Sequence, residues 1–131
     1  MEEMKNVYQS LTNIMRDWVK HMYFSVTFVK KNGDGRVMKC QLSPQSWKGN
    51  PTTNGMGLTW NPTERGFLVV WDVNSEGWRM VNFHTIQKIT FGKKDYHFQN
   101  FNHFLNFMIL QGNLQRIKLE EKKQGRELVE V

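Results

Sequence analysis

Several features that would narrow the function are scarce in this sequence of 131 residues. The only cysteine, Cys40, excludes an internal disulfide framework and a cysteine-rich zinc site. No apolar run approaches the roughly 20 residues that span a bilayer. Acidic residues follow the initial methionine, where a signal peptide carries positive charge. These absences predict a soluble, cytoplasmic protein of a reducing compartment, with no membrane partner.

Signatures of catalysis and cofactor binding are also missing. A zinc-binding helix places two histidines four residues apart, whereas His97 and His103 are six apart. The glycines at 55 and 57 are not followed by the Gly-Lys-Ser/Thr of a phosphate-binding loop. The pattern places Asp72 at a strand end facing a turn, and Cys40 among core residues. We therefore expect a non-enzymatic protein with no catalytic residue, metal or cofactor.

Positive charge is in excess and unevenly distributed. Eighteen Lys and Arg against twelve Asp and Glu give a net charge of +6 and a pI near 9.6. Residues 23–65 carry six cations and two anions, and so contribute +4 of this total. A local excess of this kind attracts polyanions. Because lysines also protect strand edges, a purely solubilising role stays open.

Residues 3–22 are predicted to form an amphipathic helix, because apolar side chains recur there at helical spacing. The apolar stripe consists of Met4, Val7, Tyr8, Leu11, Ile14, Met15, Trp18, Val19 and Met22. The opposite face is polar but not strongly basic, which disfavours a membrane-surface role. We expect the stripe to pack on the following sheet or on a second copy of the chain, which would make a homodimer.

From residue 23 the apolar period changes to two, which is typical of strands. The turn Asn32-Gly33-Asp34-Gly35 predicts a tight hairpin, because Gly and Asn tolerate positive φ. We expect five strands, near 24–28, 36–42, 67–73, 78–83 and 87–91. Five short strands joined by tight turns suit a small closed barrel, which leaves no exposed edge.

Residues 43–65 interrupt the strand pattern and contain all three prolines. A loop of this length inside a compact domain is often functional. Its tryptophans, Trp47 and Trp60, either fold back over the barrel or form a recognition surface. We assign Trp60, which precedes a strand, to packing, and leave Trp47 open.

Helical spacing returns from Phe98, and Gly112 is predicted to end this helix. The charged remainder from residue 113 is either a frayed helix or a mobile tail. We thus expect one α+β domain. It comprises an N-terminal helix (1–22), a barrel (23–92) with the long loop 43–65, and a C-terminal helix with a charged tail (93–131).

Three runs of residues carry a family resemblance. They are Phe28-Val29-Lys30-Lys31-Asn32-Gly33 with Arg36-Val37-Met38-Lys39-Cys40-Gln41-Leu42, then Val70-Trp71-Asp72-Val73 with Gly77-Trp78-Arg79-Met80-Val81, and Ile86-Gln87-Lys88-Ile89-Thr90. Together they resemble the small SH3-like β-barrel proteins of tailed phages and mobile elements, and more loosely the barrels of WYL-type regulators. The resemblance covers about residues 24–91. It implies a five-stranded antiparallel SH3-like barrel and a phage protein of the host bacterial cytoplasm.

Two functions fit these observations. The first is a phage regulatory protein of host takeover, transcription or DNA metabolism that binds DNA or RNA without sequence specificity through phosphate contacts. Its predicted nucleic-acid-binding residues are Lys30, Lys31, Arg36, Lys39, Arg79, Lys88, Lys93 and Lys94. The alternative is an adaptor or inhibitor that docks on a host machine such as RNA polymerase or a defence nuclease. Its candidate contact residues are Tyr8, Trp47 and Arg65.

Overall fold

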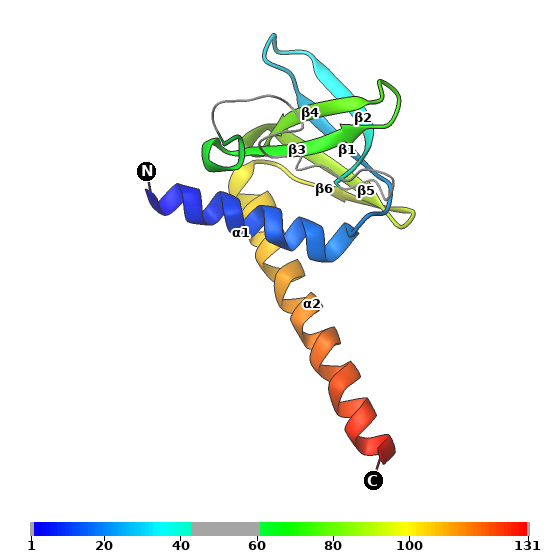
Figure 1. The fold of residues 1–131 in the computed structure, drawn as a ribbon. Helices are drawn as coiled ribbons and strands as arrows, with labels where there is room; N and C mark the ends of the chain where they lie inside the picture. Colours follow the sequence, from blue (N-terminus) through cyan, green and yellow to red (C-terminus); the bar gives the residue numbers. More distant parts are fainter. Residues whose placement is uncertain (1, 43–60, 131) are drawn as a thin grey trace.

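The computed structural model describes residues 2–42 and 61–130, and the side chains of 4–42 and 61–122. Helices α1 (Glu2–Val19) and α2 (Phe101–Glu130) lie on one side of an antiparallel sheet (Figure 1). The strands are β1 (Phe24–Val29), β2 (Gly35–Gln41), β3 (Phe67–Asp72), β4 (Gly77–Asn82), β5 (Ile86–Phe91) and β6 (Lys94–His97). Short 3-10 turns, η1 (Thr63–Arg65) and η2 (Phe83–Thr85), precede β3 and β5. The predicted α+β class is confirmed.

The strand register directs one face of the sheet to the helices. The strand order is β4-β3-β2-β1-β5-β6. Val26 of β1 lies opposite Met38 of β2 and Ile89 of β5, and all three are buried. Because side chains alternate along a strand, every second residue of β1 is buried and its neighbours are half-buried. We call the helix-facing side the inner face and the other the outer face.

The predicted closure into a five-stranded barrel is wrong, because the residues that the structure describes form a sheet of six strands whose edges are β4 and β6. The sixth strand, β6, lies within residues 93–131, which were expected to form the C-terminal helix and its tail. Gly92 and Lys93 both adopt positive φ and form the whole turn, so Lys94 already pairs with Phe91. β6 is short and largely polar, which hides its strand period. The two helices cover the inner face, so its burial does not require closure.

The apolar stripe of α1 packs on the chain's own core. Leu11, Met15, Trp18 and Val19 are all buried. The expected packing of the stripe on the chain's own sheet is therefore observed, and the expected homodimer stays a prediction. The helix ends at Val19 and not at residue 22, because Lys20 adopts a left-handed φ of 55°.

The second helix differs most from the prediction. Gly112 was expected to end it, but α2 continues from Phe101 to Glu130. A Cβ at Gly112 would lie 3.1 Å from the Ile14 side chain, so this glycine allows α1 and α2 to cross closely. Beyond the crossing, α2 extends away from the sheet (Figure 1). The described part of this extension exposes Leu114, Ile117 and Leu119.

An aromatic cluster joins the two helices to the β5–β6 edge of the sheet. Trp18 of α1 makes edge contacts with Phe91, Tyr96 and Phe107, at centroid distances of 5.5, 5.3 and 5.5 Å. These partners belong to β5, β6 and α2. Such pairs contribute about 0.5–1.5 kcal/mol each beyond their buried area, so Trp18 fixes both the β5–β6 hairpin and α2 against α1.

Gly66, between η1 and β3, lies against Tyr8 and so provides a test of how α1 packs on this segment. Gly66 has φ of +88°, and a Cβ there would lie 2.9 Å from Cζ of Tyr8. Gly33 has a similar φ of +92° with nothing within 4 Å. Both Gly→Ala variants incur the left-handed penalty of about 1–2 kcal/mol. We expect Gly66→Ala to lose measurably more free energy of unfolding in urea than Gly33→Ala, and equal losses would contradict the Tyr8 contact.

Candidate binding surfaces

The eight predicted nucleic-acid-binding residues do not form one patch but fall into three groups. Ser25 near the start of β1 pairs with Thr90 near the end of β5, so the β5–β6 turn and the β1–β2 turn lie at opposite ends of β1. A six-residue strand separates them by about 20 Å. The groups also differ in the face of the sheet that carries them. Arg36 and Arg79 lie opposite the buried residues Phe28 and Val70, whereas Lys39 and Lys88 lie on the outer face and Lys30 and Lys31 follow β1. Lys93 and Lys94 lie at the β5–β6 turn, where Lys94 lines a groove that also includes Trp18.

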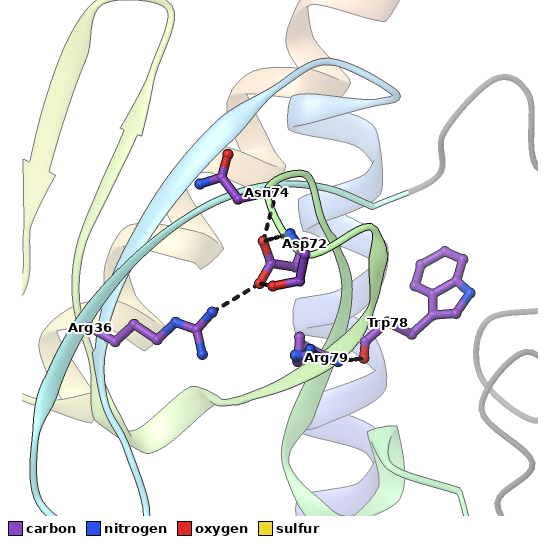
Figure 2. Close-up of polar contacts among 6 residues, drawn as sticks. Arg36, Asp72, Asn74, Trp78 and Arg79 are labelled. Atoms are coloured by element: carbon purple, nitrogen blue, oxygen red, sulfur yellow. Dashed lines mark hydrogen bonds and ion pairs between the residues drawn. The ribbon is translucent and has the colours of Figure 1, made fainter.

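Arg36 has a structural role. Its Nη2 lies 2.9 Å from Oδ2 of Asp72, whose side chain is only 1% exposed (Figure 2). β2 and β3 pair over only two residues, ending at Cys40 and Asp72. The Arg36 side chain reaches back to Asp72 from the part of β2 beyond this pairing. It therefore ties the β1–β2 hairpin to β3, and is not a free cation.

Asp72 organises the turn after β3, as its sequence position predicted. Its oxygens accept hydrogen bonds from the backbone N–H groups of Asn74 and Ser75 and from the Ser75 hydroxyl. Burial alone would raise the pKa of the Asp72 carboxyl, but these hydrogen bonds and the Arg36 charge together lower it. Arg79 lies beside the same turn and donates from Nη1 to the Trp78 carbonyl (Figure 2).

Cys40 lies opposite Asp72 and is fully buried. Burial, with a smaller contribution from the nearby Asp72 charge, strongly raises the pKa of its thiol. The thiolate is the reactive form of cysteine. The prediction that Cys40 is a core residue is therefore confirmed.

The second group of cations surrounds the outer face of β1. Ser25 lies between Lys39 and Thr90, and Thr27 lies between Val37 and Lys88. Lys30 and Lys31 are exposed in the turn that follows β1. None of these four lysines forms an ion pair with a carboxylate of the described residues. We call Lys30, Lys31, Lys39 and Lys88, with the strands that carry them, the lysine face.

An exposed aromatic residue, Tyr23, accompanies the lysine face. Tyr23 is 56% exposed, and Nζ of Lys39 lies 5.0 Å from the centroid of its ring. The sequence analysis missed Tyr23, because the residue lies between the predicted helix and the first strand. Asp95 is a carboxylate on this side of the sheet, and it accepts a hydrogen bond from the Thr90 hydroxyl at 2.7 Å.

The third group borders a groove between α1, the β5–β6 hairpin and α2. Lys94 lines this groove together with Lys20, which directly follows α1, and with Lys118 and Lys122 of α2. The groove has a volume of about 560 Å³. These three lysines were not predicted from the sequence, because Lys20 is far in the chain from Lys118 and Lys122, and only the crossing of the helices brings the two segments together. Trp18 lies at its base, and we call it the Trp18 groove.

The predicted partner-binding residues have different surroundings. Tyr8 is half-buried, stacks on Phe83 and hydrogen-bonds Nε2 of His84 at 2.7 Å. It therefore contributes to packing between α1 and η2. Arg65 is exposed at the end of η1. Trp47 and Trp60 lie outside the described residues.

No family model matches the sequence, and no significant similarity to a curated protein or to a solved structure was found. No described helix is long and apolar enough to cross a membrane. Over residues 4–42 and 61–122, no three His, Cys, Asp or Glu side chains come together as a metal site requires.

The Arg36–Asp72 pair makes the free energy of unfolding depend on pH in the acid range. Because folding lowers the pKa of Asp72, its contribution is present above the ordinary value of 3.8 and is lost as pH falls through the folded-state pKa. Removing one partner of such a pair costs about 2–4 kcal/mol. We expect Asp72→Asn to lower the free energy of unfolding by this order at pH 7, with the difference from wild type shrinking below pH 3.8.

Glu64→Gln is the matched control for this measurement. Glu64 pairs with Lys5 at 3.7 Å, but both side chains are about half exposed. Exposed pairs contribute about 0–1 kcal/mol, so the control should stay close to wild type across the same pH range. An Asp72→Asn effect that is no larger than the Glu64→Gln effect would contradict the role given to Asp72.

Proposed function

We propose that this chain is a non-enzymatic regulatory protein that binds nucleic acid, without sequence specificity, through the lysine face. The observation that carries the proposal is the grouping of Lys30, Lys31, Lys39 and Lys88 around β1 with no described ion-pair partner. Phosphate contacts from lysines supply most of the affinity of sequence-independent binding. Arg36, Arg79, Lys93 and Lys94 are not part of the proposed surface.

The dimensions of the lysine face suit a short nucleic-acid segment. Lys39 is four residues from the start of β2, and Lys88 lies opposite Thr27, two residues before the end of β1. At about 3.3 Å per residue, the four lysines span roughly 15 Å along the strands. A nucleic-acid strand carries a phosphate about every 3.4 Å of helix axis, so one segment can reach all four cations.

The exposed ring of Tyr23 favours binding of single-stranded over duplex nucleic acid. Single-strand-binding proteins combine cations that follow the backbone with aromatic rings on which bases stack, at about 1–3 kcal/mol per stacked base. The exposed Tyr23 ring beside Lys39 has this combination. Its contribution adds to the phosphate contacts without selecting a base sequence.

The resemblance to phage and mobile-element proteins supports the biological setting of the proposal. A small protein with this surface would act in host takeover, on transcription or on DNA metabolism in the bacterial cytoplasm. The alternative is an adaptor or inhibitor that docks on a host protein. The Trp18 groove favours this second function, because it combines exposed apolar side chains with four lysines.

The proposal predicts that one variant with all four lysines of the lysine face replaced binds nucleic acid more weakly and with a smaller salt dependence. The four changes are Lys30→Gln, Lys31→Gln, Lys39→Gln and Lys88→Gln. Each phosphate contact contributes about 0.7–0.9 to the slope of log affinity against log salt. Loss of four contacts should therefore lower the slope by about 3 for a labelled single-stranded oligonucleotide in fluorescence anisotropy. Circular dichroism and the urea midpoint should match wild type, since these side chains are exposed or half-buried.

A second variant controls for net charge. Changing Lys20, Lys94, Lys118 and Lys122 to Gln removes the same four charges from the Trp18 groove. The proposal requires this control to keep most of the wild-type affinity for the oligonucleotide. If both variants weaken binding equally, net charge governs the binding and no nucleic-acid site lies on the lysine face.

A further inference from the structure

The Trp18 groove has walls from three elements that are distant in the sequence. Lys20 and Met22 come from the segment after α1, and Lys94 and Tyr96 come from β6. The third wall is a single face of α2, formed by residues spaced at helical intervals from 111 to 122. This part of α2 extends beyond its crossing with α1 (Figure 1), and the groove runs along the helix face that these residues form.

The charged side chains that line the groove are all lysines. Lys20 and Lys94 lie on one side, and Lys118 and Lys122 lie on α2. No Asp or Glu is among its described lining residues, and none of the four lysines forms an ion pair with a described carboxylate. Four cations around one concave surface produce a strong local positive potential. A ligand for this groove must therefore carry negative charge.

The floor of the groove is apolar. Phe91 and Tyr96 are half-buried where they pack on Trp18. Met22, Leu114 and Leu119 line the groove and are 52%, 50% and 60% exposed. Exposed apolar side chains inside a concave site are typical of recognition surfaces. The ligand must therefore also present apolar groups.

We propose that the Trp18 groove binds an acidic amphipathic helix of another protein. A helix with apolar residues at i, i+3, i+4 and i+7 places them in one stripe, as in other helix-in-groove complexes. Its stripe covers Leu114, Leu119 and the aromatic floor, while flanking carboxylates face the lysines. A nucleic acid supplies the negative charge, but it offers no aliphatic groups for Met22, Leu114 and Leu119. This inference deepens the adaptor function given above as the alternative, and because the two surfaces are separate it adds to nucleic-acid binding on the lysine face.

The test uses the full chain and two labelled peptides of identical composition. One is an 18-residue helical peptide with a leucine stripe flanked by glutamates, and the other has the same residues in scrambled order. We expect the amphipathic peptide to bind in fluorescence anisotropy at least about tenfold more tightly than the scrambled one, since each tenfold step corresponds to 1.4 kcal/mol. Equal binding by the two peptides, or binding by neither, would overturn the proposal.

Two variants of α2 test whether the amphipathic peptide binds in the groove. Leu114→Asn changes a lining residue, whereas Leu110→Asn changes a similarly exposed leucine of the same helix that is not among the lining residues. We expect Leu114→Asn to weaken the amphipathic peptide at least about tenfold, as the burial of one leucine predicts, and Leu110→Asn to leave its affinity unchanged. Equal effects of the two changes would overturn the assignment to the groove.

Two further outcomes identify a different occupant. An oligonucleotide that competes with the peptide, and that Leu114→Asn weakens to the same extent, would mean that the groove is a nucleic-acid site. A dimer in light scattering that Leu114→Asn dissociates would mean that a second copy of the chain fills the groove. Either result overturns the proposal. A monomer whose peptide binding survives excess oligonucleotide supports it.

Discussion

The contacts of Trp18 with Phe91, Tyr96 and Phe107 hold the rest of the structure in place. The sheet is open, so its inner face stays dry only while both helices cover it. Trp18 lies where α1, the β5–β6 hairpin and α2 meet, and the absence of a side chain at Gly112 lets the two helices cross nearby. Beyond the same crossing, α2 extends away from the sheet, and its described residues up to 122 line the groove with β6 and the segment after α1. The packing that completes the core therefore also forms the groove beside it.

Local patterns in the sequence predicted most elements, because each depends on neighbouring residues. The stripe of α1, the hairpin at Asn32-Gly33 and the turn role of Asp72 follow from spacing and turn chemistry. The errors concern long-range geometry. A glycine such as Gly112 is typical of a helix end, yet here it lies inside α2 and allows the two helices to cross. The strand β6 is too short and too polar to show an alternation of apolar residues. Closure of a sheet depends on how its edge strands meet, which no local pattern records.

The distribution of the cations could not be predicted from the sequence for the same reason. Arg36 resembles Lys30 and Lys31 as a cation of one hairpin, but β3 brings Asp72 within 2.9 Å of it. Lys93 and Lys94 follow β5 by one turn, yet the antiparallel register places them at the far end of the sheet from Lys30 and Lys31. Lys20, Lys118 and Lys122 then join Lys94 at the groove. The excess of positive charge thus contributes to two surfaces of different chemistry, one on the outer face of the sheet and the other a groove with apolar side chains among its lining residues.

The central claim is that the lysine face and the Trp18 groove are independent binding sites. Backbone amide chemical shifts of the labelled protein test it most directly, with the oligonucleotide added first and the amphipathic peptide second. We predict that the oligonucleotide perturbs residues 23–39 and 86–90, and that the peptide then perturbs residues 18–22, 91–96 and 111–122 without reversing the first set. Perturbation of one common set of residues by both ligands, or displacement of the first ligand by the second, would contradict the account.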